Sequence, residues 1–218
     1  MKIKIGLSIA IVTTSLAINA FATTAGVYVG AQVGQSNTHN GAVNFPSFPG
    51  AATTVRVSPS NTGLGYRFLL GYDVTSYGGI EFGITHYAAS TYKAPAGTAC
   101  NNPAIREYGA EILGKGMVPV SVFSLIGKAG IAVIKSSKSG SLIMNSGGTT
   151  SCSSNQNTNS TTVRPAIGVG MSYDLTQNWV IDLSWMRVLK GGGLQNADLR
   201  SIGITYHFVD KYCGQFLC

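Results

Sequence analysis

The chain has very few charged residues. Asp, Glu, Lys and Arg together make up 11% of its 218 residues, less than half of the roughly 25% that is usual in soluble domains. Eight residues are acidic, whereas 28 are glycine. A soluble protein with so little charge would disperse poorly in water, so the composition argues against an ordinary soluble domain.

The sequence also lacks the motifs of common catalytic, metal and nucleic-acid sites. It contains no HExxH, paired-cysteine zinc spacing, P-loop or GxSxG pattern, and its three histidines are far apart at positions 39, 86 and 207. The formal net charge is +7, but the Lys and Arg residues are scattered singly, without a basic run. We therefore predict no enzyme activity, no cofactor, no metal and no binding of nucleic acid.

Long apolar runs are absent after the first residues, and those first residues have the pattern of an export signal. Lys2 and Lys4 precede an uncharged run over residues 5–17, and Ala20-Phe21-Ala22 is a small-any-small sequence. These features predict a cleaved signal peptide over residues 1–22. An uncleaved anchor is the alternative, but the run is shorter than the roughly 20 residues of a spanning helix. We expect export to the periplasm, the outer membrane or the medium.

Alternation of apolar with small or polar residues is present instead, and it predicts strands. Each alternating stretch has about the 9–11 residues that a tilted strand needs to cross a bilayer. The second, fourth and sixth connections are tight, at residues 75–77, 118–120 and 176–177, and the others are longer and polar. Short turns therefore lie at one rim and loops at the other. The eight predicted strands are residues 26–35, 63–74, 78–88, 105–117, 121–135, 162–175, 178–189 and 199–208.

The two faces of these strands carry different kinds of residue. One face has large apolar and aromatic side chains, and the other has glycines with a few long charged side chains. A soluble, ligand-carrying periplasmic barrel would turn its apolar face inward, but an eight-stranded barrel is too narrow for that many large side chains. We predict an outward apolar wall and a narrow or plugged lumen. Its predicted charge network comprises Arg67, Glu81, Glu111, Lys128, Arg164 and Asp182.

Aromatic residues cluster near the ends of the predicted strands. Such positions are typical of the aromatic girdles at the two membrane interfaces, although aromatics also favour strands in general. The candidates for the girdles are Tyr28, Tyr72, Tyr77, Tyr87, Tyr173, Trp179, Tyr206 and Phe208.

The last predicted strand ends in residues 201–208, where Gly203, Tyr206 and Phe208 stand in the order glycine, aromatic, aromatic. This octet resembles the closing-strand signal of bacterial outer-membrane β-barrels. Residues 77–83, 124–130 and 166–176 likewise resemble the small barrels typified by the OmpA transmembrane domain. The resemblance covers most of residues 26–208. It implies an all-β, eight-stranded antiparallel up-and-down transmembrane barrel in the bacterial outer membrane, in contact with lipid and lipopolysaccharide, inserted by the barrel assembly machinery and monomeric.

The resemblance also bears on the lumen. In that family, charges in the lumen form ion pairs that close the pore. Glu81 occupies a position like that of the family's acidic partner, and Lys128 falls where a basic residue is expected. Asp182 stands where the family often has arginine, so the pairing of these charges stays open.

The four cysteines test this topology. Cys100 and Cys152 fall in the loops after the third and fifth strands, and Cys213 and Cys218 fall in the tail after the last strand. A wall roughly 25 Å tall would separate the two pairs, whereas a disulfide needs alpha carbons less than about 7 Å apart. We predict that Cys100 pairs with Cys152 and Cys213 with Cys218, with free thiols as the alternative.

The predicted domains are the signal peptide (1–22), the barrel (23–208) and a short periplasmic tail (209–218). We expect a structural, non-enzymatic protein that presents loops at the surface. An adhesin is the alternative, because residues 37–61 and 135–161 are rich in Ser, Thr, Asn and Gly and would be either mobile or adhesive to a host surface. A lipid A hydrolase is a weaker one, since His86 and Ser90 lie four residues apart without an evident acidic partner.

Overall fold

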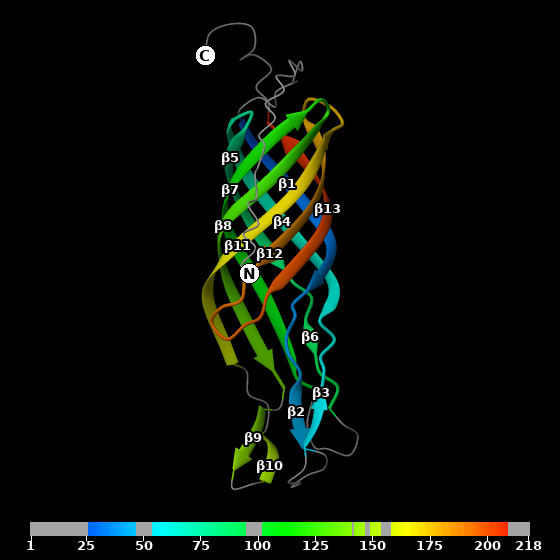
Figure 1. The fold of residues 1–218 in the computed structure, drawn as a ribbon, viewed down its shortest axis with the longest axis vertical. Coiled ribbons are helices and arrows are strands. Elements are labelled where there is room, and N and C mark those ends of the chain that lie inside the picture. The colour runs from blue at the N-terminus through cyan, green and yellow to red at the C-terminus, as the bar shows by residue number, and fades with distance from the viewer. Residues whose placement is uncertain are drawn as a thin grey trace, which may run out of the picture.

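The computed structural model describes residues 26–46, 54–94, 102–140, 142–146, 149–153 and 158–208. Its main body is a closed antiparallel barrel in which each long strand pairs with the next one along the chain, as Figure 1 shows. Pairing of the last strand with the first closes the ring, so no strand of the barrel has an open edge. The eight strands are β1 (Gly26–Asn37), β4 (Thr62–Thr75), β5 (Gly78–His86), β7 (Ala104–Val120), β8 (Phe123–Ser139), β11 (Thr158–Asp174), β12 (Trp179–Val188) and β13 (Ala197–His207).

This architecture confirms the predicted fold class, with strand ends that differ from the predicted ones by a few residues. Among the residues described, no helix is long and apolar enough to cross a membrane.

The two rims of the barrel differ as the connection lengths predict. One rim, called the turn end below, has the short connections β4–β5, β7–β8 and β11–β12 (top of Figure 1). The turn between β7 and β8 lies later in the chain than predicted, since the prediction placed it at residues 118–120. Those residues pair with β8, and the chain reverses at Ser121 and Val122, where Ser121 has a φ of 60°.

The opposite rim, called the loop end, has short strands in its loops. β2 (Val43–Pro46) pairs with β3 (Thr54–Val57), β9 (Leu142–Ser146) pairs with β10 (Thr149–Ser153), and β6 (Ser90–Thr91) pairs with β7. Both hairpins extend beyond the barrel (bottom of Figure 1). The tracts predicted to be irregular therefore contain strands, whose backbone hydrogen bonds do not depend on an apolar sequence pattern.

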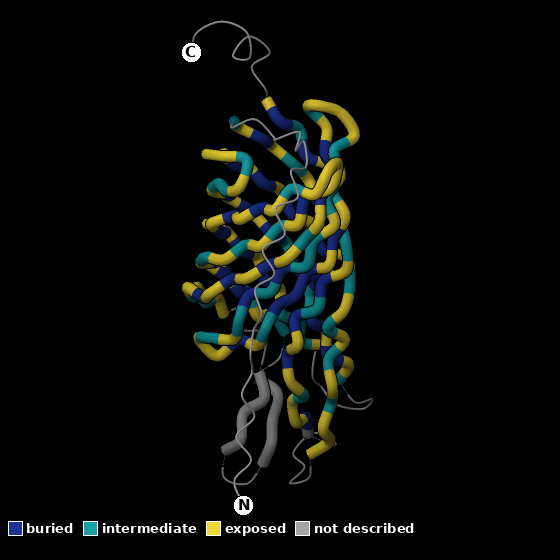
Figure 2. Tube along the Cα trace, turned by 45° about the horizontal axis from the view of Figure 1, so that its top comes forward, coloured by how far each residue is buried: buried dark blue, intermediate teal, exposed yellow. Residues whose placement is uncertain are grey.

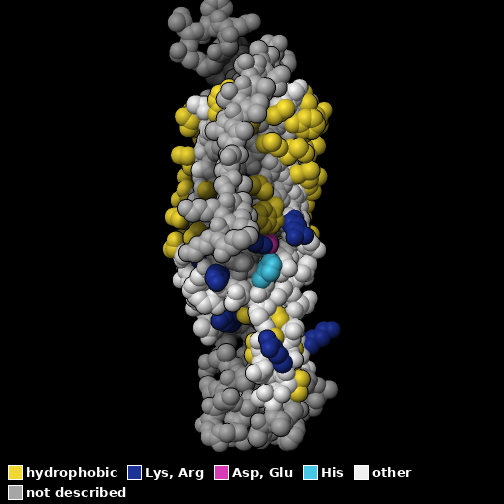
Figure 3. All heavy atoms as spheres, in the orientation of Figure 1, with side chains coloured by type: hydrophobic (Ala, Val, Ile, Leu, Met, Phe, Trp, Pro, Cys, Tyr) yellow, Lys and Arg dark blue, Asp and Glu magenta, His cyan; other side chains and the backbone are white. Residues whose placement is uncertain are grey.

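Side chains alternate between the lumen and the outer surface along every barrel strand, as the banding in Figure 2 shows. The outward side chains form an apolar band around the turn-end part of the barrel (Figure 3). The inverted, ligand-carrying barrel is thereby contradicted, because its apolar face would be inside. One outward residue of this band from each strand is Val27, Leu70, Phe82, Ile112, Leu125, Val169, Leu183 and Ile204.

Glycines let the narrow lumen hold large side chains. A Cβ atom at Gly71 would lie 2.1 Å from the ring of Tyr28, and one at Gly83 would lie 2.6 Å from the guanidinium of Arg67. Neither position can take a larger residue without moving an interior side chain. The glycine-rich face is therefore the inner face.

An aromatic girdle follows the turn end of the apolar band. Phe123 lies against Tyr173 with ring centroids 5.1 Å apart, and Tyr206 lies 4.9 Å from Trp179 and 5.1 Å from Phe208. Tyr72 and Tyr77 are also exposed at this end.

The prediction of the girdle is wrong for two residues. Tyr28 and Tyr87 are buried inside the barrel. Tyr28 lies between the outward-facing Val27 and Val29, and Tyr87 lies two residues after the inward-facing Thr85, so strand alternation turns both toward the lumen.

Several predictions concern residues outside the described ranges. Cys100, Cys213, Cys218, the signal peptide and the tail over residues 209–218 are among them. Cys152 lies in β10, where it pairs with Ile143 of β9 away from the turn of the hairpin. The proposed disulfides and domain limits remain predictions.

Candidate functional site

The centre of the lumen contains an ion-pair cluster built from four strands. Arg67 Nη1 of β4 lies 2.9 Å from Glu81 Oε1 of β5, and Arg67 Nε lies 3.0 Å from Glu111 Oε2 of β7. Lys128 Nζ of β8 donates to both carboxylate oxygens of Glu81 at 2.8 Å. Glu81 therefore bridges two cations, and Arg67 bridges two carboxylates. We call Arg67, Glu81, Glu111 and Lys128 the charged cluster.

Neutral side chains add hydrogen bonds to the two carboxylates of this cluster. Tyr28 Oη donates to Glu81 at 3.0 Å, Thr85 Oγ1 donates to Glu111 at 2.8 Å, and Tyr87 Oη donates to the same Glu111 oxygen at 3.4 Å. A buried ion pair offsets its desolvation only when such additional partners are present. Glu81 and Glu111 thus meet this condition, whereas the Nη1 and Nη2 atoms of Arg67 have no hydrogen-bond partner among the described residues.

A second ion pair lies toward the turn end, and sequence reasoning missed it. Lys115 Nζ is 2.6 Å from Asp73 Oδ1 and 4.0 Å from the ring centroid of Tyr28, and the His207 ring stacks on Tyr28 at 5.0 Å. The sequence did contain a signal for it. Asp73 and Lys115 stand an even number of residues from Arg67 and Glu111 on the same strands, which places them on the inner face.

Two of the six predicted network residues lie outside the charged cluster. Asp182 accepts a hydrogen bond of 2.5 Å from Thr205 Oγ1. Arg164 donates to the carbonyl oxygens of Leu189, at 2.6 Å, and Gln195. Its Nη1 lies 3.9 Å from Glu107, the second acidic residue, after Asp73, that the sequence reasoning missed. Arg164 therefore fastens the β12–β13 connection to the barrel wall.

A group of apolar side chains fills another part of the lumen. On β8, β12 and β13 the apolar residues lie on the loop-end side of Lys128, Asp182 and Thr205. Tyr87 belongs to this part as well as contacting Glu111, so the two regions meet at its ring. We call this region the apolar cluster; it comprises Tyr87, Leu113, Ala132, Ile134, Ala166, Met186, Val188, Leu194, Ala197 and Leu199.

Polar loop residues cover the loop-end mouth of the lumen. Ser90 Oγ lies 2.5 Å from Thr38 Oγ1, accepts from Asn40 Nδ2 at 2.9 Å and donates to Asn61 at 2.8 Å. Asn40 also donates to Glu107 at 3.3 Å. The first and second loops are thereby joined across the mouth.

Tyr92 fastens the same two loops. Its hydroxyl donates to the carbonyl of Gly41 at 3.0 Å, and burial raises its pKa above the ordinary value. The phenol therefore stays protonated, and stays a donor, throughout the physiological pH range.

The structure does not bring together the two residues of the hydrolase alternative. His86 faces outward and stacks on Tyr66 with ring centroids 4.7 Å apart, whereas Ser90 is buried among the polar loop residues at the mouth. No carboxylate orients either residue among those that the structure describes. A Ser-His nucleophile would need the two side chains within hydrogen-bond reach.

One cavity in the lumen is small. A cavity of about 20 Å³ lies at the turn-end side of the lumen, lined by Tyr28, Glu81, Lys128 and Asp182 among others. A single water needs roughly 10–15 Å³ by the same measure. The cavity therefore has room for about one ordered water, far less than a diffusing solute needs.

Comparison with known proteins agrees with the geometry. No curated protein matches the chain. Among solved structures, Neisserial surface protein A shares 16% sequence identity over 84% of this chain and 97% of its own, with a TM-score of 0.51. The outer membrane protein OprG from Pseudomonas aeruginosa shares 10% identity with the same coverage and a TM-score of 0.50. At these identities the likeness shows the fold alone.

A family model gives the assignment. The model described as "Outer membrane protein beta-barrel domain" matches residues 8–208, nearly the whole chain. Together with the closed eight-stranded barrel and its apolar outer band, this match shows that the chain belongs to the outer membrane β-barrel protein family of the bacterial outer membrane.

Proposed function

We propose that this protein is a monomeric, non-enzymatic outer-membrane barrel with a closed lumen, and that its role is to support the envelope and hold hairpins at the cell surface. The single observation that carries this proposal is the filled lumen. The charged and apolar clusters fill the lumen with side chains, and the cavity beside the charged cluster has a volume of about 20 Å³. A channel for solutes would need a continuous water-filled path, as in much wider barrels.

The orientation in the membrane follows the general rule for such barrels, with short turns in the periplasm and longer loops outside. The loop end, with its two hairpins, then faces the medium. Outer-membrane lipid and lipopolysaccharide surround the apolar band, and the barrel assembly machinery inserts the chain after the signal peptide is cleaved. These partners fit the closed ring of strands, which needs no second subunit to satisfy its edges.

Solute permeability tests the closed lumen. Purified protein in liposomes should admit small sugars no faster than protein-free liposomes, while a wide porin reconstituted in parallel provides the positive control. The folded state is checked by the change in gel mobility on heating. Rapid swelling of liposomes that contain the folded protein would contradict the proposal.

An enzyme assay tests the non-enzymatic part. We expect purified, folded protein to release no fatty acid from lipid A, because His86 and Ser90 face opposite sides of the wall. Deacylation that disappears in Ser90→Ala but persists in Ser136→Ala, another buried lumen serine, would overturn it.

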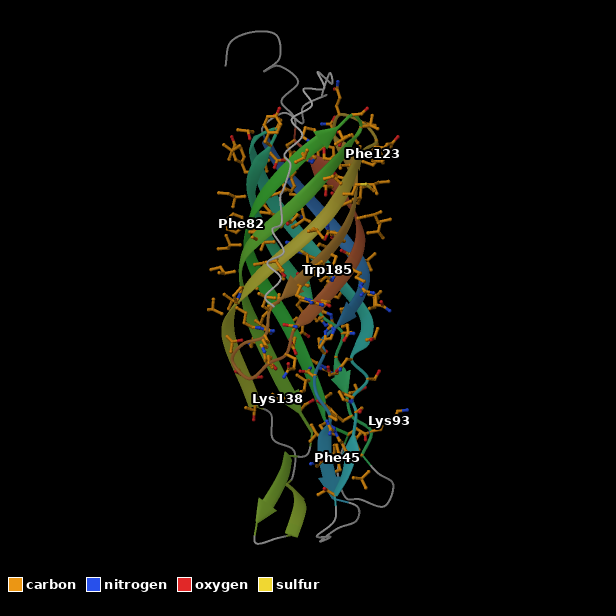
Figure 4. The ribbon with its side chains drawn as sticks, in the orientation of Figure 1. Phe45, Phe82, Lys93, Phe123, Lys138 and Trp185 are labelled. Atoms are coloured by element: carbon orange, nitrogen blue, oxygen red, sulfur yellow. The ribbon has the colours of Figure 1, made fainter. Side chains whose placement is uncertain are left out.

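Adhesion through the loop end is a second candidate, favoured by the two hairpins that extend beyond the barrel (Figure 1). The β2–β3 hairpin exposes Val43 and Val55, and Figure 4 places Phe45 there and Lys93 and Lys138 nearby at the loop end. Removal of residues 142–153 tests it, since β8 and β11 stay intact. Reduced binding of bacteria to host cells, compared with bacteria carrying a Ser/Gly replacement of equal length, would support adhesion through the sequence of this hairpin, and unchanged binding would contradict it.

A further inference from the structure

Among the described residues, the charged side chains that are exposed are all basic and lie at the loop end. Most acidic residues that the structure describes lie inside the lumen. Of the others, Asp198 is buried and paired with Arg187, and Asp174 is half-buried at the turn end. The exposed basic residues lie at the loop end, below the apolar band in Figure 3. The loop-end rim therefore presents positive charge without compensating exposed carboxylates among the described residues. The exposed basic residues are Arg56, Lys93, Arg106, Lys135, Lys138, Lys190 and Arg200.

One of these, Arg200, stands at an apolar groove on the outer wall. The groove is shallow and open to the outside; it runs over β11, β12 and β13 and is lined by Val169, Met171, Leu183 and Trp185. In the strand register Arg200 lies opposite Trp185, and Trp185 lies opposite Val169. Figure 4 shows Trp185 near the middle of the molecule, and the apolar band in Figure 3 ends near the middle of the molecule as well.

Arg200 has no counter-charge of its own within the groove. The neighbouring cation, Arg187, is neutralised by two hydrogen bonds of 2.7 Å to the carboxylate of Asp198 and lies 4.9 Å from the Trp185 ring. That carboxylate is also 3.8 Å from His39. Among the residues described, no carboxylate lies within ion-pair distance of Arg200, so its guanidinium is available to an external anion.

We propose that this groove binds a phosphorylated, acylated glycolipid of the outer leaflet, with an acyl chain along Leu183, Met171 and Trp185 and a phosphate on Arg200. An arginine fork matches the geometry of a phosphate, and the indole lies where tryptophans favour the membrane interface. The groove opens on the lipid-facing wall, which favours a lipid over a soluble polyanion. This proposal rests on the proposed orientation with the loop end outside.

Fluorescence of Trp185 tests the site. The chain has two tryptophans, so Trp179→Phe leaves Trp185 as the only indole reporter. In this background, folded protein in phosphatidylcholine bilayers is titrated with diphosphorylated lipid A, and the change in Trp185 emission gives the apparent affinity. Arg200→Gln should weaken binding about tenfold, the effect of losing one charge-assisted contact. Arg56→Gln removes the same charge from the β2–β3 hairpin and should leave binding within about twofold.

Two further comparisons identify the ligand chemistry. Dephosphorylated lipid A should bind to the parent about as weakly as diphosphorylated lipid A binds to Arg200→Gln. A soluble sulfated oligosaccharide should neither change Trp185 emission nor displace the lipid. The lipid site is overturned if Arg200→Gln binds like the parent, if Arg56→Gln weakens binding equally, or if the oligosaccharide displaces the lipid. Liposome permeability is measured on the same preparations, so failure of the closed-lumen proposal would be seen separately.

Discussion

The charged cluster and the apolar cluster fill the same lumen by different physical means. The charged cluster joins Arg67, Glu81, Glu111 and Lys128 at distances of 2.8 to 3.0 Å. The apolar cluster, centred on Leu113, Ile134, Met186 and Leu199, contains one hydroxyl, that of Tyr87. The charged cluster fills its part of the lumen with paired charges. The apolar cluster fills its part with closely packed side chains.

This difference predicts different tolerance to substitution. A buried charge that loses its partner keeps its full desolvation penalty, whereas an apolar side chain can be replaced by another of similar volume at small cost. The charged cluster should therefore depend on the identity of each residue. The apolar cluster should depend on the total volume. Each variant below is measured as the free energy of unfolding in urea, in lipid vesicles, unless another measurement is named.

The largest effect is expected from Glu81→Gln, which leaves Lys128 without its carboxylate partner and Arg67 with one of its two. We expect the free energy of unfolding to fall by about 3–5 kcal/mol, the usual cost of breaking a buried pair. The double variant Glu81→Gln with Lys128→Met removes the unpaired cation as well and should recover part of the loss. A double variant no more stable than the single one would contradict this explanation of the charged cluster.

The apolar cluster is tested by Leu113→Ala, which should cost about 3 kcal/mol because it opens a cavity in a fully buried position. Leu113→Met keeps the volume and should cost less than about 1.5 kcal/mol. Leu183→Ala is the matched control on the outer wall, where the side chain is 49% exposed and lipid can fill the space. If Leu113→Met is as damaging as Leu113→Ala, the cluster does not depend on volume as described.

Glycine positions give a third, smaller effect. Gly71→Ala places a methyl group 2.1 Å from the Tyr28 ring, which displaces the phenol that donates to Glu81. We expect a loss of about 1–3 kcal/mol, typical of overpacking. Gly127→Ala, where the added Cβ meets nothing within 4 Å, is the control and should be close to neutral. Equal effects of the two substitutions would mean that interior crowding does not explain the glycines.

A substitution at the end of the closing strand should change the packing of the lumen least, and its effect is measured on insertion into the membrane. Phe208 contacts Tyr206 in the girdle and does not face the interior. Phe208→Asp should reduce the heat-modifiable fraction in outer membranes severalfold, because it places a charge at the membrane interface, whereas deletion of residues 209–218 should reduce it less. Greater damage from the tail deletion would show that the proposed signal of Gly203, Tyr206 and Phe208 is not the main one.

Much of this fold could be predicted from the sequence because strand alternation is a local property. The period of two assigned Arg67, Glu81 and Lys128 to the inner face. The same parity would have included Asp73 and Lys115, which were missed because they lie near strand ends, where polar residues also fit a rim.

The contacts within the lumen could not be predicted, because they join residues that are far apart in the sequence. The hydrogen bond from Tyr28 to Glu81 joins residues 53 positions apart, and it depends on the register of three strands. Tyr28 and Tyr87 were assigned to the girdle by residue type, although parity pointed inward. The strands of the hairpins β2–β3 and β9–β10 have only four or five residues each, so any alternation in them is too short to tell a strand from a loop.

The closed lumen is tested most directly by planar-bilayer recording of the folded protein alongside the Glu81→Gln and Leu113→Ala variants. We predict no steady open conductance for the parent, because both clusters block the path and the cavity between its walls is about 20 Å³. Brief openings in Glu81→Gln or Leu113→Ala would show which cluster limits the path. A large, steady conductance in the parent protein would contradict the closed lumen and the structural role that rests on it.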